Sequence, residues 1–288
     1  MVWGTTWFAI RVCIGEGGYP TMPAAALRFT VAAMALGSVV ALARPEPRIE
    51  GRRQWVWLGI AGLLNGLGYA LVYFGEETVS GAFAAILFGT IPLVTAFLAV
   101  LTRTERVSLG HFIGAFTSLG GIVLIFQDRL SVSGDQAVGI GLLCAGVLVS
   151  SIYSVILKRE GLGVHPFRST FYFLLVTSVA LWAATVVRGD AGDIPWPPPV
   201  KPTLALFYLA LFGSVLTFAS YLYLLQRVSL MTTTTLVFIQ PLIALTVDMI
   251  WEPELQLSTL SYLGAGVTML GVLISVLWKE LARRARPA

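Results

Sequence analysis

Residues 69–126 decide the fold, and they read YALVYFGEETVSGAFAAILFGTIPLVTAFLAVLTRTERVSLGHFIGAFTSLGGIVLIF. The apolar run around Pro92 is long enough to cross a bilayer, which takes about 20 residues. The same pattern returns later in the chain. The matched pairs are Val79 and Val228, Ser80 and Ser229, Leu87 and Leu236, Pro92 and Pro241, Leu93 and Leu242, and Glu105 and Glu254. An internal repeat of this length predicts two copies of one multi-helix unit, at residues 1–130 and 131–288.

The composition of the whole chain excludes a soluble globular protein. Of its 288 residues, 57% are hydrophobic and 12% are charged, whereas soluble domains carry about 25% charged residues. The net charge of +4 is spread over short loops, so it does not indicate a nucleic-acid partner. The lipid bilayer is the expected surrounding of this chain.

Ten apolar segments are predicted. They cover about residues 2–18, 21–43, 55–75, 78–102, 108–127, 137–159, 166–188, 202–225, 230–251 and 257–279. The first is short for a span of a bilayer core about 30 Å thick. Either the native start lies upstream, or this helix begins inside the membrane.

The basic residues predict the orientation, because cytoplasmic loops are enriched in Lys and Arg. The even-numbered gaps between segments and the C-terminal tail hold most of them: Arg44, Arg48, Arg52, Arg53, Arg103, Arg106, Lys158, Arg159, Arg168, Arg227, Lys279, Arg283, Arg284 and Arg286. The odd-numbered gaps hold Arg129, Arg188 and Lys201 together with most of the acidic residues. Both termini are therefore expected to be cytoplasmic.

The repeat and the charges together predict an inverted repeat. Each copy has five segments, an odd number, so the second copy must be upside down in the membrane. Arg103 and Arg106 of the first copy correspond to Glu252 and Leu255 of the second, so the charge changes while the apolar pattern is kept. The predicted fold class is an all-α polytopic membrane protein with ten transmembrane helices in two inverted five-helix repeats, an arrangement typical of transporters.

The fourth and fifth segments resemble a known family. The central Pro92, the Thr104–Glu105–Arg106 turn and the following glycines are similar to the EamA repeat of the drug/metabolite transporter superfamily, as are Trp3–Gly4 and Leu27–Arg28–Phe29. The second copy departs from the pattern, with Pro253–Glu254–Leu255 in place of that turn. The resemblance implies the EamA fold, transport of small metabolites and a bacterial inner membrane, with amino-acid exporters of the YddG type as the nearest subgroup.

Polar and aromatic residues at mid-depth are candidates for lining a substrate cavity, because burying them against lipid is costly. The candidates are Trp7, Asn65, Tyr69, Ser151, Tyr153, Thr217, Tyr221 and Gln240. The alternative for the hydroxyl groups is a hydrogen bond to a carbonyl one turn back in the same helix. Asn65 and Gln240 are harder to satisfy in that way, which favours the cavity for them.

Pro92 and Pro241 each remove a backbone hydrogen bond from an apolar helix. Our hypothesis is that both act as hinges during alternating access, and the alternative is a static kink that serves packing.

Charged residues near one membrane face suggest an outer gate. We expect Arg11 or Arg28 to pair with Glu76, Glu77 or Asp248, and the alternative is that these side chains reach out to the interface. No Asp, Glu or His is expected at mid-depth, where a proton relay needs an ionisable group. Electroneutral facilitated export or exchange is therefore at least as consistent with the sequence as proton-coupled transport.

The residues point to a transporter of small molecules, most readily amino acids, because neutral hydrogen-bonding groups mixed with aromatics suit a zwitterion with an apolar side chain. The alternatives are efflux of cationic or aromatic drugs and, in another class, a non-transporting membrane subunit or channel. No enzyme motif, cofactor or metal site is expected, because His111 and His165 have no ligand or nucleophile at a suitable spacing. A monomer or a homodimer is expected.

Overall fold

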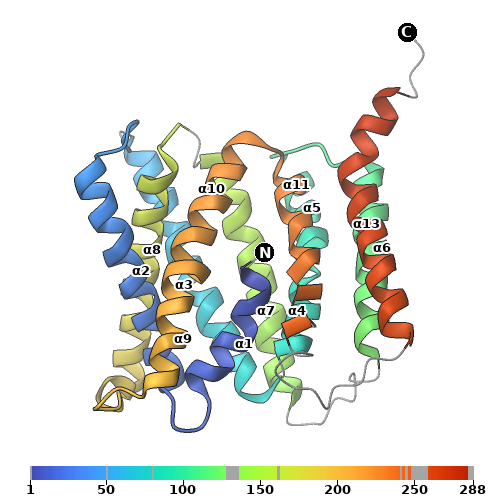
Figure 1. The fold of residues 1–288 in the computed structure, drawn as a ribbon. Coiled ribbons are helices and arrows are strands. Elements are labelled where there is room, and N and C mark those ends of the chain that lie inside the picture. The colour runs from blue at the N-terminus through green and yellow to red at the C-terminus, as the bar shows by residue number, and fades with distance from the viewer. Residues whose placement is uncertain are drawn as a thin grey trace.

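The computed structural model describes residues 2–49, 51–79, 81–127, 136–160, 163–240, 242–243, 246–247 and 259–284. Every regular element within these ranges is a helix (Figure 1). Pro241 and Asp248 lie outside the described residues. The hinge and gate roles expected of these two residues therefore have no structural description.

The helices of the first half are α1 (Trp3–Ile14), α2 (Thr21–Ala43), α3 (Arg52–Thr78), α4 (Gly81–Phe88), α5 (Ile91–Leu101) and α6 (Leu109–Phe126). Those of the second half are α7 (Gln136–Glu160), α8 (Pro166–Arg188), η2 (Asp190–Gly192), α9 (Val200–Ala210), the π-helical η3 (Leu211–Leu216), α10 (Thr217–Arg227), α11 (Leu230–Thr235), η4 (Leu236–Phe238) and α13 (Thr259–Arg284). Two of them, α2 and α8, have the bounds that the sequence predicts.

Two predicted segments depart from a regular α-helix in the structure. The segment 78–102 is divided into α4 and α5 by a turn at Gly89 and Thr90. The segment 202–225 is continuous, but a π-helical stretch, η3, joins α9 to α10. Such stretches shift the helical register and are found frequently at functional sites.

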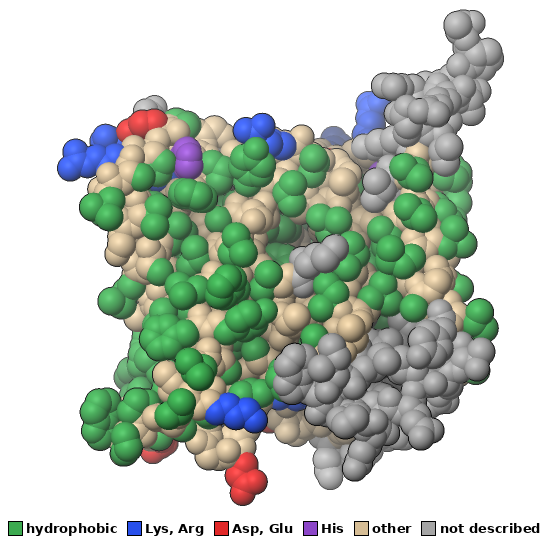
Figure 2. Space-filling view, in the orientation of Figure 1, with side chains coloured by type: hydrophobic (Ala, Val, Ile, Leu, Met, Phe, Trp, Pro, Cys, Tyr) green, Lys and Arg blue, Asp and Glu red, His purple; other side chains and the backbone are tan. Residues whose placement is uncertain are grey.

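Within the part of the chain that the structure describes, five helices are long and apolar enough to cross a membrane: α2, α3, α7, α8 and the continuous Val200–Arg227. Three shorter apolar helices lie at Ile91–Leu101, Leu109–Leu124 and Leu263–Ser275. Hydrophobic side chains cover the side of the molecule, and charged ones collect along its upper and lower edges (Figure 2). This distribution is that of a multi-pass membrane protein.

The helices form one bundle with a separate pair at its edge. Helix α3 packs against α7 and α8, α2 packs against α8, and α1 packs against α9. Helices α6 and α13 run side by side at one edge (Figure 1). Gly114 and Gly271 allow this close approach, because a Cβ atom on either would lie 2.5 Å from the other's carbonyl oxygen.

The bundle has two ends, which we name by a residue at each. The Glu76 end is where α3 ends and α2 begins, and the Glu105 end is where α5 ends and α6 begins. The Glu105 end is at the top of Figure 1.

Candidate functional site

A cavity lies at the centre of the bundle, where α1, α3, α7, α10 and α11 meet. Its volume is about 80 Å³. Its walls are Trp3, Thr6, Trp7, Ile10, Gly68, Tyr69, Val72, Phe88, Ile91, Ser150, Tyr153, Ser154, Tyr221, Thr234, Val237 and Gln240. All of these described lining residues are neutral, and aromatic rings dominate among them.

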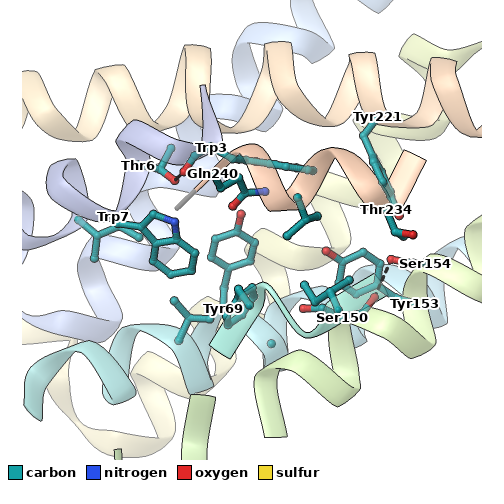
Figure 3. Close-up of a pocket in the computed structure, with 16 residues that line it drawn as sticks. Trp3, Thr6, Trp7, Tyr69, Ser150, Tyr153, Ser154, Tyr221, Thr234 and Gln240 are labelled. Carbon is teal, nitrogen blue, oxygen red and sulfur yellow. Dashed lines mark hydrogen bonds between the residues drawn. The ribbon is translucent and has the colours of Figure 1, made fainter. Parts of the chain in front are cut away.

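The labelled side chains form two groups in Figure 3. Tyr69 and Gln240 point toward one another beside the indole of Trp7. Tyr153, Ser154, Tyr221 and Thr234 gather away from them. The ring of Trp3 lies 5.6 Å from that of Tyr221, centroid to centroid. Aromatic walls with hydrogen-bonding groups at both ends fit a small molecule that has an apolar part and polar groups.

Three hydroxyl groups of the cavity are anchored in their own helices. Thr6 Oγ1 donates to Trp3 O at 2.7 Å, Ser154 Oγ to Ser150 O at 2.7 Å, and Thr234 Oγ1 to Leu230 O at 3.1 Å. Because each hydroxyl proton is used in this way, the oxygen is left to accept hydrogen bonds.

The indole N–H of Trp7 is different, because it is buried and has no hydrogen-bond partner in the structure. It is therefore a donor that is available to a ligand in the cavity.

The structure brings together five of the eight cavity candidates, namely Trp7, Tyr69, Tyr153, Tyr221 and Gln240. Thr217 lines a second cavity of about 340 Å³, which shares the walls Trp3, Tyr221, Val237 and Gln240 with the first. The hydroxyl of Thr217 donates to Gly213 O at 2.7 Å. Thr217 thus lies in the second cavity, which the four shared residues separate from the central one.

Asn65 and Ser151 do not line the central cavity, which corrects the expectation from the sequence. The side-chain amide of Asn65 donates to Thr177 Oγ1 on α8 at 3.1 Å. This contact lies in the packing between α3 and α8. Ser151 is completely buried, and only its neighbour Ser150 is among the cavity residues.

Arg28 lies behind Tyr69, fully buried in the protein. Its Nε donates to Ser214 Oγ at 2.9 Å and its Nη2 to Gly213 O at 3.1 Å, both on the π-helical η3. The guanidinium also lies 4.8 Å from the centre of the Tyr69 ring. Its polar atoms are therefore turned into the bundle, away from the interface that the alternative from the sequence proposed.

One acidic residue of the expected outer gate, Glu76, is near this cluster. Glu76 is 7% exposed, and both Arg11 and Arg28 act on it electrostatically. Glu77 is exposed and accepts a hydrogen bond from the Thr21 hydroxyl. The structure thus places Glu76 with the two arginines and turns Glu77 away from them.

Pro92 stands at the second position of α5, directly after the turn at Gly89 and Thr90. Our expectation of a hydrogen bond removed from the middle of a helix is wrong here, because the first-turn amides of a helix have no intrahelical partner anyway. The break in the helix comes before the proline. Helix α11 likewise passes into the 3₁₀ turn η4 before position 241.

A charged cluster at the Glu105 end was not foreseen. Glu105 accepts the backbone N–H of Leu230 at 2.8 Å, at the start of α11. Lys158 lies 3.6 Å from the same carboxylate and donates at 2.7 Å to each of the carbonyls of Leu225 and Val228. The Thr104–Glu105–Arg106 turn was visible in the sequence, but its partner in the other half was not.

These features define a class: a multi-pass helical membrane protein with a cavity at its centre that is lined by neutral residues. The model of the EamA-like transporter family matches residues 1–127 and 137–277. The chain therefore belongs to the EamA-like transporter family, and it is a membrane transporter and not an enzyme.

Relatives at moderate identity carry transporter names. The chain is 28% identical over 283 residues to the uncharacterized inner membrane transporter YedA of Escherichia coli K12, covering 98% of this chain and 89% of the relative. It is 26% identical to a probable terminal-alkyne amino-acid exporter of Streptantibioticus cattleyicolor, covering 95% and 89%.

It is also similar to the uncharacterized transporter YdfC of Bacillus subtilis, with 25% identity that covers 96% of this chain and 88% of the relative. A crystal structure superposes with a TM-score of 0.77 at 21% identity, covering 99% of this chain and 95% of that one. This last likeness concerns the fold alone.

Proposed function

We propose that this transporter exports amino acids with apolar side chains, or similar small zwitterions, across a bacterial inner membrane. The observation that carries the proposal is the lining of the central cavity, where aromatic rings surround neutral donors and acceptors. Rings of Trp7, Tyr69 and Tyr153 can hold an apolar side chain. Gln240 offers both a donor and an acceptor to the ammonium and carboxylate groups.

The charge of the cavity favours this reading over the efflux of cationic drugs. A cationic drug calls for an acidic residue in the wall, and the described lining residues include none. The relative named as a probable amino-acid exporter supports the same substrate class.

We further propose ten transmembrane helices in two inverted units, residues 1–130 and 131–288, with both termini in the cytoplasm. Two separate matches to one family model support the duplication. Basic residues such as Arg44, Arg53, Arg103 and Arg227 all lie where helices begin or end at the Glu105 end. On the positive-inside rule this end faces the cytoplasm, and the Glu76 end faces outward.

In this proposal, transport proceeds by alternating access. Pro92 and Pro241 would mark the points where two interrupted helices change angle, which is supported by the turn at Gly89 and Thr90 and by η4. Arg11, Arg28, Glu76 and Asp248 would form the outer gate, which is supported by the proximity of the first three.

Exchange in proteoliposomes tests the substrate. Vesicles containing the purified protein are loaded with unlabelled leucine or phenylalanine and diluted into the labelled compound, and protein-free vesicles serve as the control. We expect label to accumulate transiently inside the loaded vesicles. The absence of exchange for both compounds, together with uptake of the lipophilic cation tetraphenylphosphonium, would overturn the proposal in favour of drug efflux.

A further inference from the structure

Glu76 extends the cavity-lining face of α3 toward the Glu76 end. Tyr69 and Val72 line the cavity, and Glu76 follows Val72 by four residues, which places it one helical turn further along the same face. Its side chain is 93% buried, since only 7% is exposed. Both carboxylate oxygens are buried and have no hydrogen-bond partner in the structure.

A carboxylate without hydrogen bonds is costly to bury in its charged form. The cost falls when the group takes up a proton or forms an ion pair. Glu76 has Arg11 and Arg28 within electrostatic range, but the nitrogen atoms of Arg28 are turned to Ser214, Gly213 and two tyrosines. The arrangement described here therefore suits the neutral, protonated form of Glu76.

The other ionisable groups around Glu76 come from several helices. They are Arg11 and Cys13 on α1, Arg28 on α2, Tyr69, Tyr73 and Glu77 on α3 itself, and Arg188 on α8, which lies over the ring of Phe74. Within the described residues, α4 has no ionisable group and the first half of α7 has only the exposed Cys144. The nearby arginines favour the charged form of Glu76, whereas its burial without hydrogen bonds favours the neutral form.

We propose that Glu76 is a proton-binding site and that the transporter exchanges protons for its substrate. The proposal rests on the proposed function, and it replaces the expectation of uncoupled export, which assumed no buried acid near the substrate path. A metal cation is a poorer ligand for this site, because it needs several oxygen ligands and would be repelled by two arginines. A proton needs only the one carboxylate.

The geometry links this site to the cavity through Arg28. Once Glu76 loses its proton, its negative charge attracts the guanidinium of Arg28. That guanidinium donates to the Tyr69 hydroxyl at 3.5 Å and to Gly213 O of η3. A shift of Arg28 toward Glu76 would therefore loosen Tyr69, a wall of the cavity, and η3. Protonation at one end of the cavity is thereby coupled to the shape of the cavity.

Infrared difference spectroscopy tests the site without any substrate. Spectra of the wild type in lipid are compared between pH 5 and pH 9, with Glu76→Gln and Glu77→Gln alongside. We expect a protonated-carboxyl band that changes with pH in the wild type and in Glu77→Gln, and that is lost in Glu76→Gln. A wild-type difference spectrum that Glu76→Gln leaves unchanged would overturn the proposal.

A pH gradient tests the coupling. Proteoliposomes with an interior one pH unit more acidic than the medium are given labelled leucine, with the membrane voltage clamped at zero by potassium and valinomycin. At one proton per leucine the gradient supports at most about a tenfold accumulation, because one pH unit and a tenfold concentration ratio are equal free energies. We expect several-fold accumulation for the wild type, Glu77→Gln and Glu76→Asp, and none for Glu76→Gln.

The two proposals fail in different ways. If the wild type exchanges leucine but the gradient drives no accumulation, or drives it equally in Glu76→Gln, proton coupling at Glu76 is wrong and the exporter remains. If the wild type moves neither leucine nor phenylalanine, the proposed substrate is wrong, and the infrared experiment still decides whether Glu76 binds a proton.

Discussion

Nε of Arg28 on α2 donates to Oγ of Ser214 on η3 at 2.9 Å, a contact between residues that are 186 positions apart. The preceding residue, Gly213, accepts from the same guanidinium through its carbonyl at 3.1 Å. A fully buried charge is tolerated where several acceptors satisfy it. The π-helical stretch aims Ser214 and the carbonyl of Gly213 at Arg28, and so ties the first half of the chain to the second.

Replacing Arg28 with Lys should destabilise the protein although the charge is kept. An ammonium group cannot reproduce the planar fork that reaches Ser214 and Gly213 together, and a lost hydrogen bond to a charged group costs about 1.5–3 kcal/mol. We expect a lower midpoint of thermal unfolding in detergent. Arg48→Lys is the matched control, because Arg48 is exposed and pairs with Glu46. Equal melting of both variants would contradict the role given to Arg28.

Removing one hydroxyl from the cavity should weaken substrate binding. Tyr153→Phe keeps the aromatic wall and deletes a group that faces the cavity. A lost hydrogen bond worth about 0.5–1.5 kcal/mol corresponds to a rise of roughly 2- to 12-fold in the KM for leucine exchange. Tyr172→Phe is the control, because Tyr172 packs against Trp55 with ring centroids 4.4 Å apart and lies away from the cavity. A KM that rises equally in both variants would argue against the cavity as the binding site.

The sequence predicts which helices supply the cavity better than it predicts which residues face it. Hydropathy locates an apolar segment within a few residues, but successive residues on a helix are about 100° apart. Ser150 faces the cavity and Ser151 does not. An uncertainty of one residue in the orientation of α7 decides between them, and composition cannot resolve it.

Asn65 shows a second limit on what the sequence can predict about the site. It lies one turn from Tyr69 on α3, so the two were expected to share a role. Helix α3 packs against α7 on one side and α8 on another, and Asn65 is used in the contact with Thr177 of α8. The partner of a buried amide depends on tertiary packing, as does the contact of Arg28 with η3. Neither follows from spacing along one helix.

Replacing Asn65 with Ala should therefore affect stability and leave substrate affinity unchanged. The variant loses the hydrogen bond to Thr177 and leaves a small cavity between α3 and α8, at a cost of about 1–3 kcal/mol. We expect a lower unfolding midpoint together with a wild-type KM for leucine exchange. A raised KM at wild-type stability would indicate that Asn65 contacts the substrate.

The variant Pro92→Ala should distinguish between two roles for Pro92, a hinge that moves during transport and a static feature that serves packing. Because Pro92 stands in the first turn of α5, its removal restores no lost intrahelical bond, and the free energy of unfolding should change by less than about 1 kcal/mol. If the break at Gly89 and Thr90 flexes during transport, Ala at position 92 should slow leucine exchange by allowing the helix to extend. The double variant with Pro241→Ala should slow it further. Wild-type exchange rates in the double variant would show that neither proline acts as a hinge.

Glu105 should stabilise the start of α11 and keep it close to Lys158 of α7. Its carboxylate accepts the N–H of Leu230 and lies 3.6 Å from the ammonium of Lys158. An acceptor at a helix N-terminus stabilises the helix by about 1 kcal/mol. Glu105→Ala should therefore increase amide hydrogen exchange at Leu230 and Met231 several-fold, and Glu105→Gln, which keeps an acceptor oxygen, should increase it less.

Glu46→Ala serves as the control for that experiment, because Glu46 is exposed and pairs with Arg48 in a loop. Helix α11 leads through η4 to Gln240, a wall of the cavity. Loosening its start should thus also change the rate of leucine exchange in Glu105→Ala. If amide exchange at Leu230 stays at the wild-type rate, Glu105 does not fasten α11, and the Glu105 end of the cavity must be closed by other contacts.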